Sequence, residues 1–567
     1  MMSSVVRRAS FFVVALLLAS TALPAVGQQL PYGQENELAI GSDEAFDLWP
    51  VDLKINGQVM MAGSAELPEG TVPFFLSLVR RRAGDDPIQI WHVSIGAMEG
   101  GPEWPADVNV QAIRFQGGQA LDMSGVHGLW LSAGGQRPAA ARLPSPEILR
   151  ELAGPLRDFV EQGGILFTEA DTSPWMGAQA CHPGGPNAFP QVAAGLGLVP
   201  DCVIACPFDS ADELPLLSAL TISPRSVGVG IPPGGVVVLN GRKMRAYGKP
   251  GAVLLAGNTE EPVRRKVLRV GSYGQRRINP YLQMIDLTAW RRDAIDRTHP
   301  PFPPSNPPKP FVENGSLVIV GGGGMPEGLM EKFVELAGGS EAKLVYIPCA
   351  ESDEVPVNQR LLDRWLELGA KSAVQLHTKD RVRANSDEGF LEPLRKATGI
   401  WYGGGRQWNF SDSYFGTESH RLMKQVVERG GVVGGSSAGA SIQARYLARA
   451  NPLGNFDIMV DGYERGGLGF LRGVAIDQHF TQRRRQKDMS SLVDTFPQLL
   501  GIGLDEKTAI LVQGSTAEVV GDGRAFFYDR EQPVIPGQPD YVALESGERY
   551  DLENRSPLAV QTEDESD

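Results

Sequence analysis

The sequence predicts an α/β protein that is organised around mainly parallel β-sheets and divided into two halves. Its 567 residues correspond to about two to four domains of ~150 residues each, and 42% hydrophobic residues are enough to bury their cores. The 67 glycines and 42 prolines, with only 21% charged residues, are typical of an α/β chain with many tight loops. Seven prolines between 299 and 310 exclude helix and interior strand, so an extended spacer is expected there.

Beyond this spacer, short apolar runs alternate with helical periodicities. The expected elements are a strand at 317–320, a helix at 325–337, a strand at 343–347, a helix at 357–368 and a strand at 373–377. Strands separated by helices imply crossover connections and a mainly parallel sheet. Functional loops are therefore expected at the carboxyl ends of the strands.

The first half of the chain shows the same order of parts. A strand at 128–133 leads into a glycine pair, a helix starts at Ser145 and Pro146, and a strand follows at 165–168. In the second half, a strand at 400–402 likewise leads into glycines, before a helix and a further strand.

Aligning Glu161–Gly164 with Glu428–Gly431 places Ala170 where Ser437 stands. We therefore expect the first half to be a degenerate copy of the same architecture that lacks a nucleophile. The alternative is that helix, glycine stop and strand recur in any α/β domain. Different strand orders in the two halves would exclude the duplication.

The N-terminus has the features of a secretory signal peptide. Arg7 and Arg8 precede the apolar run Phe11–Ala19, and Ala25-Val26-Gly27 offers the small residues that a signal peptidase needs. We expect cleavage near Gln28 and export of the protein, to the periplasm or the cell exterior. The alternative is an uncleaved N-terminal anchor. No apolar run reaches the ~18 residues of a membrane span.

The net charge disfavours nucleic acid as a partner. The formal charge is −14, and it becomes −16 if the two arginines of the leader are removed. A chain of this charge is poorly suited to contact a phosphate backbone over a broad surface.

The four cysteines do not define a metal site or a disulfide framework. Cys181, Cys202 and Cys206 lie in the first half, where an exported chain could oxidise one pair. A zinc site at Cys202 and Cys206 lacks a second ligand pair, since only His182 stands nearby. Cys349 follows an apolar strand and is expected to be a buried thiol. We expect no metal and no cofactor.

The strongest chemical signal is the segment Gly434–Ala440. Ser437 has a glycine two positions before it and another two positions after it, which is the spacing of a nucleophile elbow. Ser436 is the fallback nucleophile, and a helix is expected at 441–447. The backbone N–H of Ala438 can help to stabilise an oxyanion. The alternative is a small-residue turn with an incidental serine.

Three histidines after the spacer could serve as the base. His420 lies within a predicted helix and is expected to be solvated, whereas His377 ends an early strand. His479 ends the apolar stretch Val474–Gln478, at the active edge of the sheet, and is the best general base. The alternative is a core histidine bonded to a backbone carbonyl.

A carboxylate is needed to orient the imidazole. Asp477 is too near in sequence to face His479 from the same strand. Asp505 and Glu506 lead into the apolar strand Ala509–Val512 and approach the same rim. We favour Glu506, although a solvated turn carboxylate is an equally simple interpretation.

Two further features frame a pocket. Gly404 and Gly405 allow the backbone to approach a ligand and supply amides for the oxyanion, and Gln407 can donate and accept hydrogen bonds. Arg483–Arg485 could bind substrate carboxylates, or they form a solvated basic face. The glycines at Gly321–Gly324 could equally be a bare turn.

Together these segments resemble the cyanophycinase and aspartyl dipeptidase family of serine peptidases over about residues 314–530. That family has a glutamine-amidotransferase-like sheet, a Gly-Thr-Ser-Ala-Gly-Ala elbow, a Gly-Gly-x-Gln loop, an Asp-Gln-His-Phe motif followed by spaced arginines, and a later Asp-Glu-x-Thr-Ala motif. The matching segments here are Gly435–Ala440, Gly404–Gln407, Asp477–Phe480 with Arg483 and Arg485, and Asp505–Ala509.

The resemblance implies a triad of Ser437, His479 and Glu506 that hydrolyses aspartyl peptide bonds through an acyl-enzyme. It further implies that Gln407, Asp477, Gln478, Arg483 and Arg485 line the substrate pocket, that the substrate is a peptide or polyaspartate, and that the protein forms a homodimer.

Two departures affect the substrate that the resemblance implies. Arg406 stands where cyanophycinases usually carry an acid, and Asp488 replaces a third spaced arginine. Cyanophycin is a polyaspartate bearing arginines, so Arg406 should weaken contact with its guanidinium groups. The alternatives are an aspartyl dipeptidase-like exopeptidase and a non-catalytic secreted binding protein on the same fold.

These features divide the chain into five expected segments. They are a signal peptide at 1–27, a non-catalytic α/β domain of unknown role at 28–298, a proline-rich linker at 299–311, a cyanophycinase-like domain at 312–530 and a C-terminal surface tail at 531–567.

Overall fold

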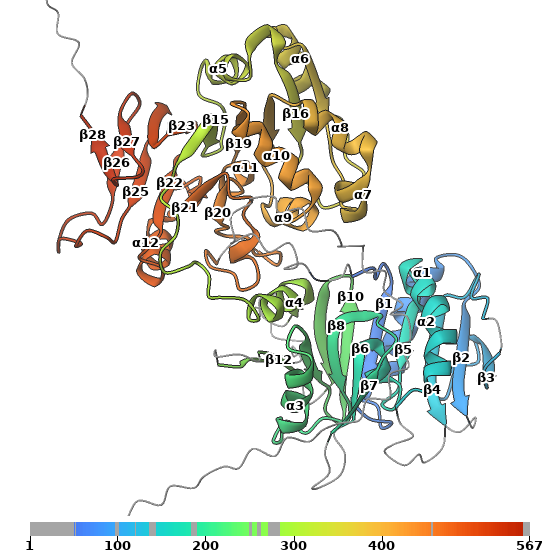
Figure 1. The fold of residues 1–567 in the computed structure, drawn as a ribbon. Helices are drawn as coiled ribbons and strands as arrows, with labels where there is room; N and C mark the ends of the chain where they lie inside the picture. The colour runs from blue at the N-terminus through green and yellow to red at the C-terminus, as the bar shows by residue number, and fades with distance from the viewer. Residues whose placement is uncertain are drawn as a thin grey trace, which may run out of the picture. The chain divides into compact units, whose positions relative to one another are not determined.

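A large, partly parallel sheet forms the centre of the first half of the chain (Figure 1). Its strand order is β14-β11-β10-β1-β5-β4-β2-β3, in which β1, β5, β4, β2 and β3 are parallel and the other three strands are antiparallel. The strands are β1 (Gln58–Ala62), β2 (Gln89–Gly96), β3 (Asn109–Phe115), β4 (Gly128–Gly134), β5 (Ile165–Thr168), β10 (Gly235–Asn240), β11 (Lys243–Gly248) and β14 (Met284–Asp286).

The computed structural model of the protein describes residues 50, 53–96, 101–118, 121–134, 143–182, 190–248, 252–257, 262–269, 284–454 and 457–559. The predicted signal peptide lies outside the described residues. No helix among the described residues is long and apolar enough to cross a membrane.

Helices cover both faces of this sheet. Helix α1 (Thr71–Ala83) packs Phe75 and Val79 against Trp130 and Phe167 on one face. Helix α2 (Pro146–Glu161) packs its apolar stripe against the other face. The Oγ of Ser145 accepts the Ile148 N–H and caps α2, as the Ser-Pro start predicts.

A second sheet completes the first half. Its order is β13-β12-β9-β8-β6-β7, and helix α3 (Leu214–Ile222) packs against β8 and β9. The strands are β6 (Gly177–His182), β7 (Gln191–Ala194), β8 (Val199–Ala205), β9 (Val227–Gly230), β12 (Val253–Ala256) and β13 (Arg264–Val267). Helix α4 (Leu287–Asp296) ends this half, and the 3₁₀ turn η2 (Ser173–Met176) follows β5.

The second half of the chain has a nine-stranded sheet with the order β17-β16-β18-β19-β15-β23-β24-β27-β28 and a smaller sheet with the order β20-β21-β22-β25-β26. The larger sheet contains β15 (Val312–Val320), β16 (Lys343–Ile347), β17 (Ser372–Gln375), β18 (Gly399–Tyr402), β19 (Val432–Ser436), β23 (Thr508–Gly514), β24 (Thr516–Gly521), β27 (Arg549–Asp551) and β28 (Ser556–Leu558). The smaller sheet contains β20 (Ala444–Tyr446), β21 (Leu471–Gln478), β22 (Leu500–Leu504), β25 (Ala525–Tyr528) and β26 (Val542–Leu544).

The helices of the second half connect and flank these strands. They are α5 (Leu329–Leu336), α6 (Gln359–Glu367), α7 (Arg381–Ser386), α8 (Glu388–Lys396), α9 (Trp408–Tyr414), α10 (Glu418–Glu428), α11 (Ala438–Ser441) and α12 (Gln486–Thr495), with the short 3₁₀ turns η4 (Gly339–Glu341) and η5 (Glu464–Gly466). Helix α5 packs Phe333 against Trp401 of β18, with the two rings nearly perpendicular and 5.0 Å apart.

The two halves share one strand order in both of their sheets, apart from the edge strands β7 and β28. Reading the larger sheets from one edge, β3-β2-β4-β5-β1-β10-β11-β14 corresponds to β17-β16-β18-β19-β15-β23-β24-β27, with the same parallel and antiparallel pairings. The smaller sheets correspond in the same way, from β6-β8-β9-β12-β13 to β20-β21-β22-β25-β26. The prediction of a second α/β fold of similar type in the first half is confirmed.

Several boundaries differ from the predicted ones. The helix expected at 325–337 begins only at Leu329, because Gly328 precedes it in the left-handed region at φ 72°. The helix expected at 441–447 is wrong: α11 ends at Ser441, and Ala444–Tyr446 leaves it to pair with β21. Because residues 444–446 pair with β21 as an edge strand, they cannot also continue α11.

The segment expected as a surface tail, 531–567, is described to residue 559, and this part is only partly irregular. Strands β26, β27 and β28 lie within it and extend the two sheets of the second half. Their three-residue length makes the apolar alternation too short to read from the sequence.

The proline-rich segment at 301–311 contains no helix or strand. It runs along the second half, where the Gln498 side chain donates to the carbonyls of Pro303 and Pro304. The described residues from 50 onward, on both sides of this segment, lie in one compact unit.

Candidate active site

Ser437 occupies a strained turn between β19 and α11. Its backbone has φ 58° and ψ −113°, a region that non-glycine residues rarely adopt. A Cβ on Gly435 would lie 2.3 Å from the Gly439 carbonyl oxygen, and one on Gly439 would lie 2.2 Å from the Tyr402 carbonyl oxygen. The two glycines around the serine are therefore sterically required.

The Ser437 hydroxyl lies within hydrogen-bond distance of an imidazole. Its Oγ is 2.9 Å from Nε2 of His479, which follows β21 directly. The backbone N–H of His479 donates to the Gly321 carbonyl at 2.8 Å and fixes the residue at φ 50°. Burial lowers the pKa of His479 below its ordinary value, and the nearby Arg483 lowers it further, against the raising effect of Glu506. The imidazole is therefore neutral at pH 7 and can accept a proton.

Glu506 orients this imidazole. Its Oε1 accepts from Nδ1 of His479 at 2.6 Å. Asp505 is turned away, since it accepts the backbone N–H and the hydroxyl of Thr481 at 2.9 and 2.6 Å. The serine, the histidine and the glutamate thus form one hydrogen-bonded chain from three separate loops at the carboxyl ends of β19, β21 and β22.

The glycine loop after β15 makes room for two members of this chain. A Cβ on Gly322 would lie 2.4 Å from Cε1 of His479, and one on Gly323 would lie 2.5 Å from Oε2 of Glu506. Both glycines have positive φ, at 98° and 69°. The sequence allows either a ligand loop or a bare turn here, because a run of glycines does not reveal which side chain approaches it.

The glycine loop Gly403–Gly405, which follows β18, lies beside Ser437. A Cβ on Gly404 would lie 3.5 Å from the Cβ of Ser437, and both Gly404 and Gly405 are exposed. Ala438 is fully buried at the start of α11. Cys349 packs against Gly405 and its thiol donates to the Arg406 carbonyl at 2.9 Å, while burial raises its pKa to about 12.

Gln407 does not open toward the nucleophile. It is only 1% exposed, and its Nε2 donates to the carbonyls of Ala448 and Arg449 at 2.8 Å each. The structure therefore places Gln407 as an anchor for the glycine loop, which differs from its predicted place in the substrate pocket.

Asp477, Gln478 and Arg485 are likewise buried, contrary to the prediction that they line the pocket. Arg485 donates to Asp477 at 2.8 Å and to the Gln478 carbonyl at 2.6 Å. Arg449 ion-pairs with Asp477 and with Asp488, both at 2.8 Å. Asp477 is 0% exposed, so its charge needs these two cations.

Arg449 and Asp488 complete this buried network. No motif points to Arg449, which is distant in sequence from the histidine motif, and Asp488 stands out only because it replaces a third spaced arginine. The exposed basic residues on the loops of the site include Arg406, Arg483, Arg484 and Lys507.

The remaining histidines have structural partners. His420 is 2% exposed rather than solvated, because its Nε2 faces the Leu468 carbonyl at 2.8 Å and its Nδ1 accepts the Gly416 N–H. His377 contacts the Ser352 carbonyl at 2.8 Å.

The described residues of the first half carry no equivalent of the chain from serine to glutamate. Ile319 pairs with Gly435 and Ile510, and Met61 pairs with Thr168 and Val237 in the same way. Ser437 lies two residues after Gly435 and Ala170 lies two residues after Thr168. Ala170 therefore takes the place of Ser437. The N–H of Phe480 donates to the Leu504 carbonyl, as that of Phe208 donates to the Ile231 carbonyl. Counting from these pairs, Pro207 takes the place of His479 and Pro233 that of Glu506.

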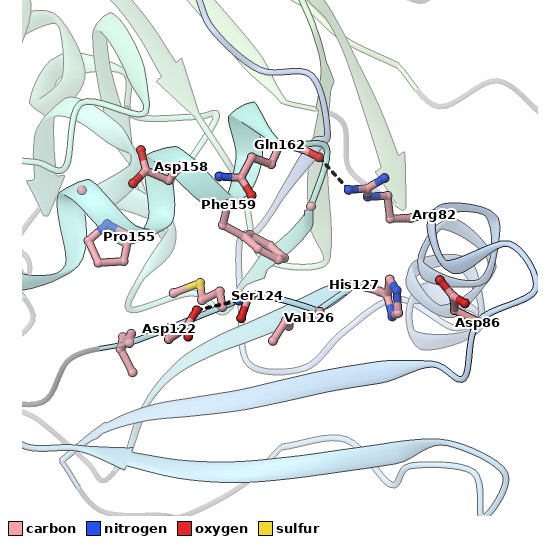
Figure 2. Close-up of a pocket in the computed structure, with 15 residues that line it drawn as sticks. Arg82, Asp86, Asp122, Ser124, Val126, His127, Pro155, Asp158, Phe159 and Gln162 are labelled. Carbon is pink, nitrogen blue, oxygen red and sulfur yellow. Dashed lines mark hydrogen bonds between the residues drawn. The ribbon is translucent and has the colours of Figure 1, made fainter.

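A cavity of about 500 Å³ lies elsewhere in the first half. Figure 2 shows its polar lining, with Arg82 linked to Gln162, Asp122 linked to Ser124, and His127 nearby. His127 precedes β4, so the cavity adjoins the amino ends of the parallel strands. This is the edge opposite to the one that carries Ala170, and the cavity is unrelated to the site around Ser437.

The four cysteines are free thiols in the structure. Among the described residues, no group of three or more His, Cys, Asp and Glu side chains is arranged to hold a metal ion. Cys202 is fully buried, and burial raises its pKa to about 12, which disfavours the thiolate that zinc requires.

Comparison with known proteins finds peptidases that are similar to the second half of the chain. Residues 317–520 match the model of peptidase family S51. A cyanophycinase of Geminocystis herdmanii is 29% identical over 270 residues, which are 44% of this chain and 98% of that protein. A cyanophycinase of Trichormus variabilis is 28% identical over 248 residues, 41% of this chain and 82% of that protein.

A solved structure of a peptidase from an acI-B1 Actinobacterium aligns with 42% of this chain and 98% of its own, at 21% identity and a TM-score of 0.31. The protein is a serine-type peptidase, and its residues 317–520 are similar to peptidase family S51.

Proposed function

We propose that Ser437, His479 and Glu506 are the catalytic triad of this peptidase and that it hydrolyses peptide bonds next to aspartyl residues. The observation that carries the proposal is the hydrogen-bonded chain from the Ser437 hydroxyl through His479 to Glu506, at 2.9 and 2.6 Å. A strained serine, a neutral imidazole and an orienting carboxylate are the three parts that acyl transfer requires.

In the proposed reaction, Nε2 of His479 takes the hydroxyl proton as the Ser437 oxygen attacks the peptide carbonyl. The oxyanion is stabilised by the backbone N–H groups of Gly404, Gly405 and Ala438. His479 then gives the proton to the leaving amine, and water releases the acyl-enzyme by the same steps. Glu506 keeps the Nδ1–H pointing away from the serine and stabilises the imidazolium.

The substrate class follows from the relatives and from the charge of the loops at the site. The two relatives compared above are cyanophycinases, which supports an aspartyl substrate such as cyanophycin or related peptides. Arg406, Arg483 and Arg484 are exposed on these loops and favour carboxylates.

The same three arginines favour a second candidate, an exopeptidase acting on small aspartyl peptides. Exposed guanidinium groups repel the arginine side chains that cyanophycin carries. The buried Asp477 cannot offset them, because its charge is already paired with Arg449 and Arg485.

The experiment compares hydrolysis of cyanophycin, β-aspartyl dipeptides and α-aspartyl dipeptides by the parent protein and by a Ser437→Ala variant, and it labels separate samples of both with a fluorophosphonate probe. Labelling confined to Ser437, and hydrolysis that the variant lacks, support the proposed triad. Ser437→Ala hydrolysing at the parental rate overturns it. The preferred substrate separates the two candidates.

We also propose that the protein is exported after cleavage near Gln28 and that it forms a homodimer. The charged, apolar and small-residue parts of its first 27 residues support export. N-terminal sequencing of protein recovered outside the cytoplasm tests the cleavage, and a start at Met1 overturns it. Sedimentation of the purified protein tests the dimer.

A further inference from the structure

A buried ionic cluster joins the two halves of the chain close to the loop that carries Gly404 and Gly405. Its centre is Arg242, in the turn between β10 and β11 of the first half. Around it lie Asp286 from the first half and Asp412 and Tyr463 from the second. The side chains of Asp286 and Asp412 are only 3% and 11% exposed, so their charges depend on the cations beside them.

Each donor of the Arg242 guanidinium has a partner. Its Nε and Nη2 donate to the Asp286 carboxylate, the second at 2.9 Å, and its Nη1 donates to Asp412. The Tyr463 hydroxyl donates to the other oxygen of Asp412 at 2.8 Å. The guanidinium also lies over the Trp408 ring, 4.7 Å from its centroid. Lysine could not reproduce this planar arrangement.

Asp412 and Trp408 belong to α9, which follows the loop Gly403–Gln407 directly. A helix of two turns does not hold its own position, so neighbouring groups must set where it lies. Burial alone would raise the pKa of Asp412, but Arg242, Lys379 and Arg292 hold it below its ordinary value, and the carboxylate stays charged.

The glycine loop is held at its carboxyl end by Gln407 and by α9. Gln407 donates to the carbonyls of Ala448 and Arg449 within the second half. Helix α9 is held by Arg242 and Arg292 from the first half and by Lys379 and Arg381 from the second. Just before these anchors, Gly404 stands beside Ser437, and Gly405 has φ 154°, which only glycine tolerates readily.

We propose that Arg242 is a positioning residue for the peptidase reaction: from the half of the chain that lacks a triad, it fixes α9 and thereby places the Gly404 and Gly405 amides for the oxyanion. The inference rests on the proposed function. Oxyanion donors must lie about 2.7–3.1 Å from the developing charge, so a small shift of α9 lowers the rate of the chemical step.

The test compares Arg242→Met with Arg264→Met in the full chain. Arg264 is a matched control, since it also links the halves, through an ion pair with Asp461 at 2.9 Å, and it stacks on Trp290 at 4.1 Å. Its side chain is 26% exposed against 22% for Arg242, and Asp461 is not part of α9. Both variants lose a cation that bridges the halves.

We expect Arg242→Met to lower kcat and the rate of fluorophosphonate labelling at Ser437 by about 10- to 100-fold with KM changed less than threefold. Arg264→Met should stay within about threefold of the parent in both, although both variants lower Tm. Arg242→Ala should regain part of its rate in methylguanidinium. If Arg242 only stabilised the fold, Arg242→Met would lower Tm without a fall in kcat at nearly unchanged KM.

Equal rates for Arg242→Met and Arg264→Met, or a loss that only tracks the folded fraction, overturn the inference while the proposed function stands. If Arg242→Met does not fold, Asp412→Asn makes the same comparison from the other side of the pair. A parent protein that neither labels nor hydrolyses any of the aspartyl substrates overturns the proposed function, and this inference with it.

Discussion

The two halves of the chain share one architecture but differ at every position that bears chemistry. Both have the same strand order in both sheets, apart from the edge strands β7 and β28, and both place a glycine against a phenylalanine ring, as Gly503 against Phe480 and Gly230 against Phe208. Yet the first half has Ala170, Pro207 and Pro233 where the second has its triad. The fold thus does not depend on the triad, which occupies loops that the sheets can hold with or without it.

The loop after β15 in the second half and the corresponding loop after β1 in the first half differ in the same way. The N–H of Gly321 donates to Thr508 and that of Gly63 to Gly235, so the two loops correspond. The next residue is Gly322 in the second half and Ser64 in the first. A side chain is excluded only where an imidazole needs the space, and the Ser64 hydroxyl instead accepts the Gly234 N–H at 3.0 Å.

The largest expected effect comes from giving the second half the first half's residue at the elbow. Ser437→Ala should lower kcat by about 10⁴-fold or more, because the nucleophile is lost. The reverse change, Ala170→Ser, should add no activity, since Pro207 and Pro233 supply neither base nor acid. Turnover of an aspartyl dipeptide and probe labelling measure both. Activity of an Ala170→Ser/Ser437→Ala double variant would contradict the comparison.

The next effect concerns the orienting carboxylate. Glu506→Gln should lower kcat by about 10³- to 10⁴-fold with little change in Tm, because the amide can hold the wrong tautomer of His479. Asp505→Asn serves as the neighbouring control and should affect Tm more than kcat, since Asp505 binds Thr481. A larger loss of kcat in Asp505→Asn would reverse the assignment.

A smaller effect is expected at the glycine loop. Gly322→Ser should lower kcat/KM by about 10²-fold, since its Cβ would lie 2.4 Å from the His479 ring and must displace it. Ser64→Gly, the reciprocal change, should leave kcat/KM within about twofold. Steady-state kinetics measure kcat/KM of the two variants. Equal losses in both would contradict the expectation that a side chain is excluded only beside the His479 imidazole.

The smallest effect is on pH dependence. His479 must be neutral to act as base, so activity is complete above its pKa and is lost as the pH falls through it. Because that pKa is lowered in the free enzyme, the acid limb of kcat/KM should lie below pH 6.5. Arg483→Ala removes a charge that lowers it and should move the limb upward, changing the rate by about two- to threefold near the midpoint. A limb that moves downward would contradict this.

Local chemistry explains what could be read from the sequence. The elbow glycines, the apolar strands and the helix stops act on their near neighbours, so β5, β16 and Ser437 could be placed from short segments alone. Aligning Glu161–Gly164 with Glu428–Gly431 was also enough to place Ala170, because the helix end and the next strand are separated by the same number of residues in both halves. Short edge elements such as β20 and β28 could not be placed, since pairing rather than propensity creates them.

The sequence by itself determined the α/β class, the repeated order of parts and the residues from which a triad could be chosen. Only the tertiary structure decided that Glu506 rather than Asp505 faces His479, that Asp477 and Arg485 neutralise each other inside the protein, and that Arg242 reaches α9. These outcomes depend on contacts between groups that are far apart in the chain, where burial and distance, and not residue type, set which charges meet.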